Sequence, residues 1–530
     1  MCGFVVIEGK FDSFLTQDFK SDYNKLSHRG PDDHQLVSFS QGLIGFHRLA
    51  IMDLSEHGRQ PFVSINQNQL VCNGEIYNYL ALKNECTNHQ FISHSDCEVL
   101  LPLYEIWGIR KLVENLDAEY ALVIWDEKKQ KLLAARDPMG IRPLFYGKTK
   151  SLKMAFASEV KALIDFCDDI KAFPPGYYFD GEEFHCYLDL GTVSSFHQLS
   201  ENEILKGINS RLVKAVEKRL QSDAEVGFLL SGGLDSSLVC AIAQRLNSKT
   251  PIRTFSIGMP DDAIDSKYAQ EVAHFIGANH TNVTMTKQDV LAALKQVIWH
   301  LETWDITTIR ASIGMYLVCK FIKENTSIKV LLTGEVSDEL FGYKYTDFAP
   351  SASEFQKEAQ KRIRELYLYD VLRADRSISA NSLEARVPFS DSEFVQFVMA
   401  INPEMKMNKT GMGKFLLREA FRADQLLPDS ILWREKAAFS DAVGHSMVDE
   451  LKAYAETQYT DEDLLKAAVK YSYKPPFTKE SLLYRDLFES FYPHRAELIP
   501  DFWMPNSSWR NCQVSDPSAR VLPNYGKSGK

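Results

Sequence analysis

The pattern of apolar and polar positions divides this 530-residue chain into two halves. In the first half, short alternating or apolar runs bounded by turn residues predict β-strands at residues 3–7, 69–72, 120–126 and 132–136. A helical stretch at 97–107 interrupts these runs, and Ser95 or Asp96 is placed to cap it. We therefore expect an α+β sandwich over about the first 190 residues.

The second half has a different periodicity, in which strand-like and helix-like segments alternate. Buried strands are predicted at residues 226–230, 252–257, 281–285 and 329–332. Each is followed by turn residues and an amphipathic segment, such as the stripe at 268–276 that stops at Gly277. This alternation predicts an α/β domain with a doubly wound parallel sheet and helices on both faces.

Polar stretches mark the expected limits of these domains. The stretch at 188–200 separates a first domain at residues 2–190 from a second domain at residues 200–505. The remaining residues, 506–530, are polar and rich in turn residues, so we expect a loosely packed tail. The charged helical run at 356–370 is expected to present a solvated face.

Composition argues against several classes of protein. An apolar fraction of 45% with 25% charged residues is typical of a globular protein, and 530 residues are too many for one core. The net charge of −11 argues against a partner nucleic acid or membrane surface, and we find no apolar run of membrane-spanning length. The nine cysteines are scattered without a CxxC pair, which argues against a disulfide framework or a zinc site. We expect a cytoplasmic protein.

Candidate chemistry begins at the second residue. Removal of Met1 would leave Cys2 at the N-terminus, with a thiol nucleophile and a free α-amine on one residue. The α-amine has a pKa of about 7.7–8.0 and is partly unprotonated near neutral pH, whereas the thiol, with a pKa of about 8.5, needs activation. Taken alone, Cys2 is equally consistent with a small residue that follows the start.

A glycine-rich loop forms the strongest internal motif. The sequence Ser231-Gly232-Gly233-Leu234-Asp235-Ser236-Ser237 follows a predicted strand and opens a predicted helix. Glycines allow the backbone to approach a phosphate, and N–H groups at a helix N-terminus attract it. Asp235 would repel a bare phosphate and therefore suggests a metal bridge, and the loop lacks the lysine of a Walker P-loop. The alternative is a capped helix with a tight turn.

An acidic cluster, Glu335-Val336-Ser337-Asp338-Glu339, directly follows the strand predicted at 329–332. In a doubly wound sheet this cluster and the glycine-rich loop lie at the same edge. Carboxylates beside a phosphate loop suit Mg²⁺, with Asp338 the preferred ligand. The alternative is an acidic first turn of a helix.

Together these segments resemble the glutamine-hydrolysing asparagine synthetases over essentially the whole chain. The first half is similar to a class II glutamine amidotransferase domain, of the N-terminal nucleophile type, at Cys2-Gly3, His28-Arg29-Gly30-Pro31-Asp32, Arg48-Leu49-Ala50-Ile51, Asn73-Gly74-Glu75-Ile76-Tyr77-Asn78 and Ser95-Asp96-Cys97-Glu98. The second half is similar to an ATP-pyrophosphatase synthetase domain at 231–237, Glu302-Thr303, Thr307-Thr308-Ile309-Arg310, 334–339, Glu384-Ala385-Arg386-Val387-Pro388-Phe389, Trp433-Arg434-Glu435-Lys436 and Asp516-Pro517-Ser518.

For the first domain, the resemblance implies hydrolysis of glutamine. Cys2 would attack the side-chain amide, form a thioester and release ammonia. Asn73 and the backbone N–H of Gly74 would form the oxyanion hole. The substrate glutamine would be bound by Arg48, Ile51, Asn73, Gly74, Glu75 and Asp96.

For the second domain, the resemblance implies that aspartate attacks the α-phosphate of ATP to give β-aspartyl-AMP and pyrophosphate, and that ammonia then displaces AMP. Glu335 and Lys436 would be catalytic, and Mg²⁺ bound with ATP would contact Asp235 and Asp338. Aspartate and pyrophosphate would lie near Thr307, Thr308 and Arg310. ATP would bind to Leu230, Ser231, Gly232, Gly233, Asp235, Ser236, Ser237, Ile257, Thr333 and Gly334. The family also suggests a homodimer.

Three positions depart from the family pattern, and all lie in or near the synthetase motifs. Val336 stands where the family has glycine, the segment around Gly342 is one residue shorter, and Ala437-Ala438 replaces polar residues. A β-branched residue tolerates positive φ poorly, so we expect a shift of the loop at Val336. Two alternatives therefore stay open: amidation of another carboxylate, and a non-catalytic protein that binds glutamine or nucleotide.

Overall fold

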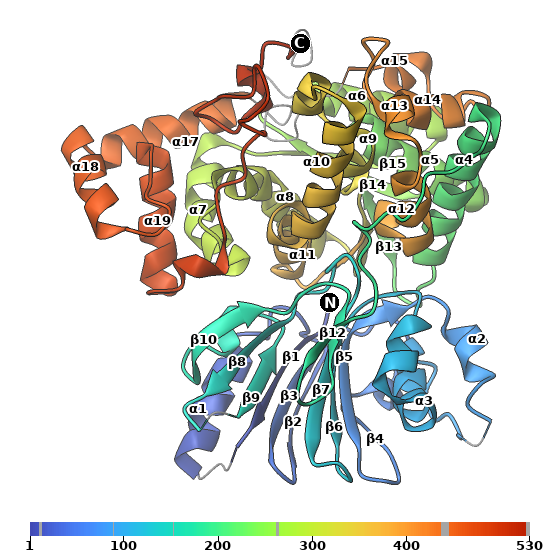
Figure 1. The fold of residues 1–530 in the computed structure, drawn as a ribbon, viewed down its shortest axis with the longest axis vertical. Helices are drawn as coiled ribbons and strands as arrows, with labels where there is room; N and C mark the ends of the chain where they lie inside the picture. The colour runs from blue at the N-terminus through green and yellow to red at the C-terminus, as the bar shows by residue number, and fades with distance from the viewer. Residues whose placement is uncertain (10–12, 88, 152, 261–263, 436–444, 526–530) are drawn as a thin grey trace.

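The computed structural model describes residues 1–530 apart from 10–12, 88, 152, 261–263, 436–444 and 526–530. Figure 1 shows two stacked halves, with the blue N-terminal half below and the green-to-red C-terminal half above. The N-terminus lies where the halves meet, and the α-amine of Met1 is 3.5 Å from the Leu383 carbonyl of the upper half. The candidate nucleophile Cys2 therefore lies close to the contact between the halves.

Two antiparallel six-stranded sheets form the N-terminal half. Sheet A has the strand order β10 (Cys167–Ala172), β8 (Phe145–Thr149), β9 (Met154–Ala157), β1 (Gly3–Glu8), β3 (Gly42–Arg48) and β2 (Asp33–Phe39). Sheet B has the order β12 (Phe184–Cys186), β11 (Tyr177–Phe179), β7 (Lys131–Arg136), β6 (Ala118–Asp126), β5 (Gln69–Ile76) and β4 (Phe62–Val63). The helices are α1 (Ser13–Asn24), α2 (Tyr79–Lys83) and α3 (Leu100–Glu114), with 3₁₀ turns at Glu56–Gly58, Asp96–Val99 and Val160–Ala162.

Alternating side chains explain how these sheets stack. On β1, Phe4 and Val6 point between the sheets and pack in one cluster with Trp125 of sheet B. Val5 and Ile7 point to the opposite face, which packs with residues of α1. Helix α3 covers the outer face of sheet B. The result is a sandwich of four layers, helix–sheet–sheet–helix, which confirms the predicted α+β fold.

A five-stranded sheet, sheet C, organises the C-terminal half. Its order is β15 (Asn279–Thr284), β14 (Arg253–Gly258), β13 (Val226–Leu229), β16 (Val330–Leu332) and β17 (Glu384–Arg386), and all neighbouring strands are parallel. One apolar cluster packs α4 (Glu201–Arg219), α5 (Leu234–Leu246) and α12 (Ser392–Met399) on one face. Another packs α7 (Lys287–Leu301), α8 (Ile306–Asn325) and α11 (Asp370–Ser379) on the other. The predicted doubly wound parallel sheet is confirmed.

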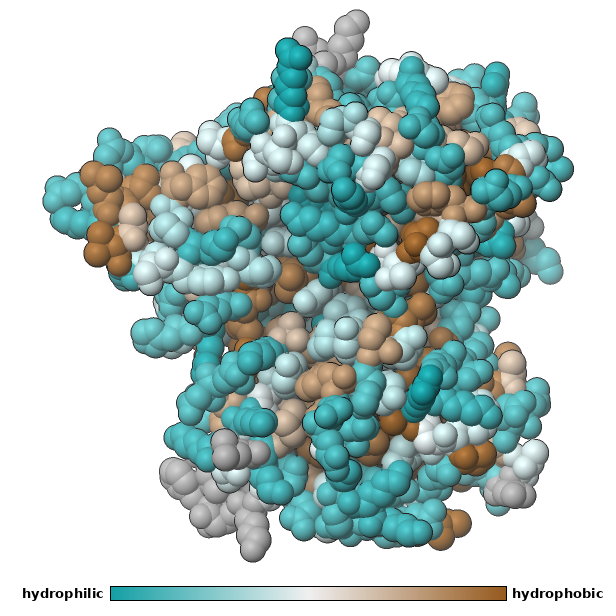
Figure 2. All heavy atoms as spheres, viewed as in Figure 1, coloured by the Kyte–Doolittle hydropathy of each residue, from teal (hydrophilic) through white to brown (hydrophobic). Residues whose placement is uncertain are grey.

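The helices of this half are α4 (Glu201–Arg219), α5 (Leu234–Leu246), α6 (Ile264–Ile276), α7 (Lys287–Leu301), α8 (Ile306–Asn325), α9 (Ser337–Phe341), α10 (Ala352–Glu365), α11 (Asp370–Ser379), α12 (Ser392–Met399), α13 (Pro403–Lys406), α14 (Phe415–Arg422), α15 (Asp429–Leu432), α17 (His445–Gln458), α18 (Asp461–Lys470) and α19 (Lys479–Phe491). Short 3₁₀ turns lie at Lys344–Phe348, Leu366–Leu368, Pro388–Ser390, Ala496–Leu498 and Ala519–Val521. Among the described residues, we find no helix with the length and apolarity needed to cross a membrane. Figure 2 shows brown, apolar spheres at the α18 end of the upper half, and Leu465 and Val469 of this helix are 73% and 84% exposed.

The order of sheet C places two loops side by side. Going outward from β13, the strands continue to β14 and β15 on one side and to β16 and β17 on the other. The direction of winding therefore reverses between β13 and β16, the position where parallel sheets form ligand-binding crevices. The loops that leave these two strands carry the glycine-rich motif and the acidic cluster.

Two segments are more buried than the sequence predicts. The run at 356–370 is predicted to be solvated, but Gln356, Glu358 and Arg362 on α10 are at most 6% exposed. Arg362 Nε donates to Glu358 Oε1 at 2.8 Å, so these charges are buried as a pair. The tail is predicted to pack loosely, yet Trp509 and Cys512 are buried in a cluster with Tyr345. Helix α10 does present a solvated face with Lys357, Lys361 and Arg364, but its opposite face buries charged groups. Polar composition therefore does not exclude burial of paired or aromatic groups.

Strand β17 is absent from the prediction because two of its three residues are charged. Glu384 and Arg386 are 2% and 0% exposed, and Arg386 Nε donates to Glu384 at 2.9 Å. Their burial brings charge into the layer between the two halves, beside the N-terminus.

The backbone at Val336 keeps a left-handed conformation. Its φ is +79°, and the side chain is 1% exposed within an apolar cluster. A non-glycine residue in this region costs about 1–2 kcal/mol. Packing of the buried side chain therefore offsets backbone strain, and the loop does not move to an extended conformation.

The balance between side-chain packing and backbone strain at Val336 predicts the relative stability of two variants. Val336→Ala is expected to lower the free energy of unfolding by about 2 kcal/mol, because buried carbon atoms are lost while φ stays positive. Val336→Gly removes one more carbon but relieves the strain, so we expect it to be at least as stable as the alanine variant. Urea denaturation of both variants measures the order. A glycine variant less stable than the alanine variant by about 1 kcal/mol or more would show that the backbone carries no strain.

Candidate functional site

Cys2 directly precedes the central strand β1, and its half-buried side chain packs against the apolar cluster between sheets A and B. Its thiol donates to the Leu49 carbonyl at 3.8 Å, next to the predicted Arg48. With Met1 in place, burial raises the pKa of the thiol to about 11. Burial likewise lowers the pKa of the Met1 amine to about 5. The surroundings therefore favour the neutral forms of both nucleophile and terminal amine.

The end of β5 carries the next predicted group. Asn73 is fully buried, and neither atom of its side-chain amide has a hydrogen-bond partner among the described residues. Gly74, the next residue, pairs in register with Tyr120 of β6. A buried amide without partners is costly unless it binds something else, so Asn73 is available to a ligand.

The remaining residues predicted to bind glutamine have definite partners. Arg48 donates from Nη1 to the Ser55 carbonyl at 2.6 Å and from Nη2 to the Asp53 carbonyl. Ile51 is buried at 3% exposure. Asp96 accepts from the Ile76 N–H at 2.6 Å, and burial raises the pKa of its carboxyl to about 6.

Glu75 connects this pocket to the C-terminal half. Its Oε2 lies 3.0 Å from Nη2 of Arg386 on β17, and burial raises the pKa of its carboxyl well above the usual range. The charge of Glu384 acts on Glu75, Asp96 and the Cys2 thiol alike. The structure thus brings the predicted glutaminase residues into one neighbourhood at the interface.

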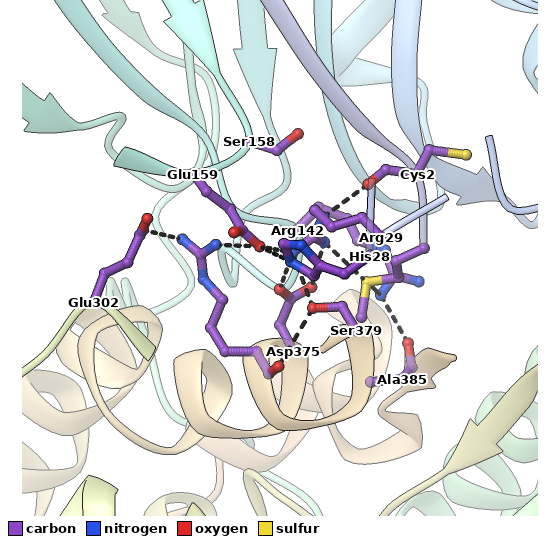
Figure 3. Close-up of polar contacts among 12 residues, drawn as sticks. Cys2, His28, Arg29, Arg142, Ser158, Glu159, Glu302, Asp375, Ser379 and Ala385 are labelled. Carbon is purple, nitrogen blue, oxygen red and sulfur yellow. Dashed lines mark hydrogen bonds and ion pairs between the residues drawn. The ribbon is translucent and has the colours of Figure 1, made fainter. Parts of the chain in front are cut away.

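Figure 3 shows Arg29 between Cys2 and helix α11 of the C-terminal half. Its Nε donates to the Cys2 carbonyl at 2.9 Å, and its two terminal nitrogens donate to Asp375 at 2.9 and 3.2 Å. Glu159 accepts from Arg29 at 2.7 Å and also pairs with Arg376. All of these side chains are at most 3% exposed.

A second group of buried charges lies beside the first. Arg142 donates to the Ala385 carbonyl at 2.7 Å and lies 3.3 Å from Glu119 and 3.6 Å from Glu384. Glu119 in turn accepts from Arg219 of α4 at 2.8 Å. Charged side chains on both halves therefore neutralise each other in a layer closed to solvent.

A cavity of about 210 Å³ lies in the C-terminal half at the reversal point between β13 and β16. Most of the residues predicted to bind ATP line it, together with residues of the acidic cluster, of α8, α10 and α11, and of the C-terminal segment. Its lining includes Leu230, Ser231, Gly233, Asp235, Ser236, Ile257, Thr307, Arg310, Thr333, Gly334, Glu335, Asp338, Glu339, Arg362, Asp370, Arg373, Trp503, Pro517, Ser518 and Ala519.

The glycine-rich loop makes a tight turn at the N-terminus of α5. Gly232 has a φ of +73°, and a Cβ there would lie 2.5 Å from the backbone nitrogen of Ala269. A Cβ on Gly334 would lie 2.8 Å from the nitrogen of Ser236, so the two loops touch through their backbones. Ser237 is fully buried behind the loop. Both glycines are therefore required by close approach, and backbone N–H groups gather at the helix N-terminus.

The two predicted metal ligands converge on one positive charge. The Nζ of Lys414 lies 2.8 Å from Asp235 Oδ1 and 2.6 Å from Asp338 Oδ1. Carboxylates that share one ammonium group are close enough to share a cation, so both residues fit Mg²⁺. Within the described ranges, three or more His, Cys, Asp or Glu side chains do not gather as a complete metal site. Mg²⁺ would therefore need further oxygens from a bound ligand such as phosphate.

The predicted Glu335 pairs with an arginine of α11. One carboxylate oxygen is 3.5 Å from Nη2 of Arg373, and the other is buried without a hydrogen-bond partner in the described structure. Arg373 also donates to Asp370 at 2.9 Å. Burial, with the charges of Asp370 and Asp338, raises the pKa of the neighbouring Glu339 to about 8.

The residues predicted near aspartate and pyrophosphate separate into different environments. Thr307 lines the cavity and its buried hydroxyl has no partner among the described residues, whereas Thr308 donates to Asp305, the N-cap of α8, at 2.7 Å. Arg310 lines the cavity but is 3% exposed and pairs with Glu480 and Asp516. Of the three, Thr307 is the one whose polar group is open to a ligand.

Lys436 and Ala437-Ala438 lie outside the described residues, so the structure does not place them. Arg434, two residues earlier, donates to the Gly232 carbonyl at 3.0 Å and to Asp265 at 2.9 Å. This segment therefore reaches the glycine-rich loop.

Several cavity residues were not predicted from the sequence. They are the lining residues Asp370, Arg373, Trp503 and Ala519, and beside the cavity Lys414, which pairs with Asp235. Lys414 follows Gly411 and Gly413 and has a φ of +58°, which is a local signal of a special backbone position. The others lie in segments that polarity alone assigns to the surface.

Known protein families match both halves of the chain. Residues 1–184 match a glutamine amidotransferase domain, and residues 207–354 and 345–519 match asparagine synthase. A probable glutamine-hydrolysing asparagine synthetase of Acanthamoeba polyphaga mimivirus is 42% identical over 94% of this chain and 96% of its own length. Those of Gallus gallus and Homo sapiens are 39% and 38% identical, over 99% and 100% of both chains. This chain therefore belongs to the family of glutamine-hydrolysing asparagine synthetases.

Proposed function

We propose that this protein makes L-asparagine from L-aspartate, using ammonia from L-glutamine and converting ATP to AMP and pyrophosphate. The observation that carries the proposal is the shared contact of the two sites. Helix α11 contacts Arg29, which holds the Cys2 carbonyl, through Asp375, and it lines the nucleotide cavity through Arg373. One chain thus combines a nucleophile site with a nucleotide site across a solvent-free interface.

In the glutaminase site, Cys2 attacks the side-chain amide of glutamine after Met1 is removed, and its own α-amine takes the thiol proton. The amide of Asn73 and the N–H of Gly74 stabilise the oxyanion, a type of contact worth about 2.7–4 kcal/mol in related acyl transfers. The C–N bond breaks, ammonia leaves, and water hydrolyses the thioester to glutamate.

Three charged residues orient the substrate glutamine. Arg48 receives its α-carboxylate, and Asp96 and Glu75 receive its α-ammonium group. Ile51 forms an apolar side of this pocket. The carboxylate pair is buried, which makes its attraction to a positive charge stronger than in water.

In the synthetase site, the β-carboxylate of aspartate attacks the α-phosphate of ATP, and pyrophosphate leaves. Backbone N–H groups of the glycine-rich loop and Lys414 face the phosphates, and Thr307 faces the acceptor. Asp235 and Asp338 would hold Mg²⁺, which when bound neutralises phosphate charge. Ammonia then attacks the acyl carbon and AMP leaves, while Glu335 accepts a proton from the attacking nitrogen. Lys436 supplies a further positive charge toward the leaving phosphates.

We also propose that the enzyme works in the cytoplasm as a homodimer. All nine cysteines are unpaired thiols, which supports a reducing compartment. The dimer rests on the family resemblance alone, and sedimentation of the purified protein tests it.

A mass-spectrometric assay tests the central proposal. Purified protein is given aspartate, ATP with Mg²⁺, and glutamine labelled with ¹⁵N in the side-chain amide. Labelled asparagine with matching AMP and pyrophosphate is expected. Labelled ammonia and glutamate without asparagine would instead point to another acceptor carboxylate. Binding of glutamine and nucleotide without any turnover would point to a non-catalytic protein.

Cys2→Ala is expected to abolish glutamine-dependent asparagine synthesis and to leave ammonia-dependent synthesis within about twofold of wild type, because the thiol serves one site only. Asparagine formation with each nitrogen source measures this. Cys186→Ala, which removes an exposed thiol, is the matched control and should leave both activities intact. Equal loss of both activities in the Cys2 variant would contradict two separate sites.

The pKa of Asp96 predicts a pH dependence. Burial raises this pKa to about 6, so the carboxylate that pairs with glutamine is ionised above pH 6 and neutral below it. We expect kcat/KM for glutamine hydrolysis to fall about tenfold per pH unit below this value. Glutaminase kinetics between pH 5 and 8 measure the profile. Asp96→Asn should have a raised KM and no inflection near pH 6; an inflection that persists would assign it to another group.

A further inference from the structure

The C-terminal segment at residues 503–519, here called the C-terminal wall, forms part of the nucleotide cavity. Trp503, Pro517, Ser518 and Ala519 all line it. In Figure 1 the dark red chain leaves the α19 region and runs up beside α10 to the C-terminus. The end of the chain therefore supplies part of the lining of the cavity.

The first half of the wall is held by buried groups of α8 and α10. The N–H of Trp503 donates to Asp305 at 2.7 Å, and Nη2 of Arg362 donates to the Met504 carbonyl at 2.6 Å. The guanidinium of Arg362 also lies over the Trp503 ring, 4.8 Å from its centroid. Asn506 donates to Glu358 at 2.9 Å. These contacts fix the path of the chain before it crosses the cavity.

The second half is held by one carboxylate. Asp516 accepts from both terminal nitrogens of Arg310, at 3.0 and 3.2 Å, and from Lys452 of α17 at 2.7 Å. It also accepts from the N–H of Ser518 at 2.7 Å, which shapes the turn that reaches the cavity. Burial alone would raise the pKa of Asp516, but Arg310 and Lys452 hold it well below its usual range. The wall is thus anchored in its ionised state at neutral pH.

The partners of Arg310 show whether Asp516 is needed to neutralise the arginine or to anchor the C-terminal wall. Its other edge pairs with Glu480 of α19, whose carboxylate accepts from Nε at 2.8 Å. This buried arginine therefore stays neutralised without Asp516, so the second carboxylate is not needed to keep its charge buried. What Asp516 adds is attachment of the C-terminal wall to α8.

The proposed reaction needs such a wall. An acyl-adenylate reacts with water as well as with ammonia, and exclusion of water protects reactive intermediates. Attack by water would form a bond from its oxygen to the acyl carbon, break the acyl–phosphate C–O bond, and return aspartate, AMP and a proton. ATP would then be consumed without asparagine.

We propose that the C-terminal wall seals the acceptor end of the cavity against water, and that Arg310 and Asp516 are positioning residues that keep it in place. This inference rests on the proposed function. Arg310 was expected near pyrophosphate; here it acts on the reaction through the C-terminal wall. Loss of the pair would raise hydrolysis of the acyl-adenylate relative to amidation, whereas loss of a phosphate ligand would slow both together.

Asp516→Asn tests this assignment, because the amide keeps the size of the side chain and removes its charge. Saturating aspartate, ATP, Mg²⁺ and ammonium are supplied, and AMP released per asparagine formed is measured. We expect a ratio near one for wild type and about threefold or more higher for the variant. Glutaminase activity should stay within about twofold. AMP release with aspartate but no nitrogen source should rise in parallel.

Two further variants control the experiment. Glu456 of α17 pairs with Lys479 of α19, with 2.7 Å between the carboxylate oxygen and Nζ, and this pair does not involve the C-terminal wall. Glu456→Gln breaks the pair and should leave the ratio of AMP to asparagine unchanged. Lys452→Ala removes only the more exposed partner of Asp516 and should raise the ratio less, which provides a test if Asp516→Asn folds poorly.

The outcomes separate this inference from the proposed function. A lower rate at an unchanged ratio of AMP to asparagine in both Asp516→Asn and Lys452→Ala would overturn the role of the C-terminal wall. Wild-type protein that forms no asparagine from aspartate and ammonium would overturn the proposed function, and the inference with it.

Discussion

The layer of buried charges between the two halves is the constraint on which both sites depend. An ion removed from water needs partners close by, and loss of one partner is far more destabilising than loss of a surface pair. Glu159 meets this need with Arg29 from its own half and Arg376 from α11. Asp375 meets it through two hydrogen bonds from Arg29. Because these partners come from different halves, sliding one half over the other would leave charges buried and unpaired.

Helix α11 carries this constraint into the chemistry. Its residues Asp370 and Arg373 line the nucleotide cavity, and its residues Asp375 and Ser379 accept hydrogen bonds from Arg29. Arg29 holds the backbone of Cys2, and Arg373 approaches Glu335. The group proposed to release ammonia and the group proposed to receive its proton are therefore both held by residues of one short helix. The relative position of Cys2 and Glu335 therefore follows from the packing of α11.

Local sequence patterns predict the parts of this structure that bury apolar side chains. Strands β1, β6 and β13 are marked by alternation or apolar runs, and the glycine-rich loop is marked by the strand before it and the helix after it. Patterns of this kind fail where charges are buried in pairs. Strand β17 is charged and central to the interface, and α10 has a polar face that is buried. The partners that make such burial possible are hundreds of residues away, as for Arg29 with Asp375, so no local window contains the signal.

The charge balance of the cavity explains why so many buried pairs surround it. Seven acidic and three basic side chains line it, and two of the basic ones, Arg310 and Arg362, are already engaged by the C-terminal segment or its neighbours. Repulsion among the remaining carboxylates raises the pKa of Glu339 to about 8, after burial itself. A cavity with an excess of carboxylates favours ligands that bring positive charge, and an amino acid together with a cation-bound nucleotide does so. Anions that arrive without a cation meet like charges. The same acidic lining that raises the pKa of Glu339 therefore selects the charged form in which the proposed substrates bind.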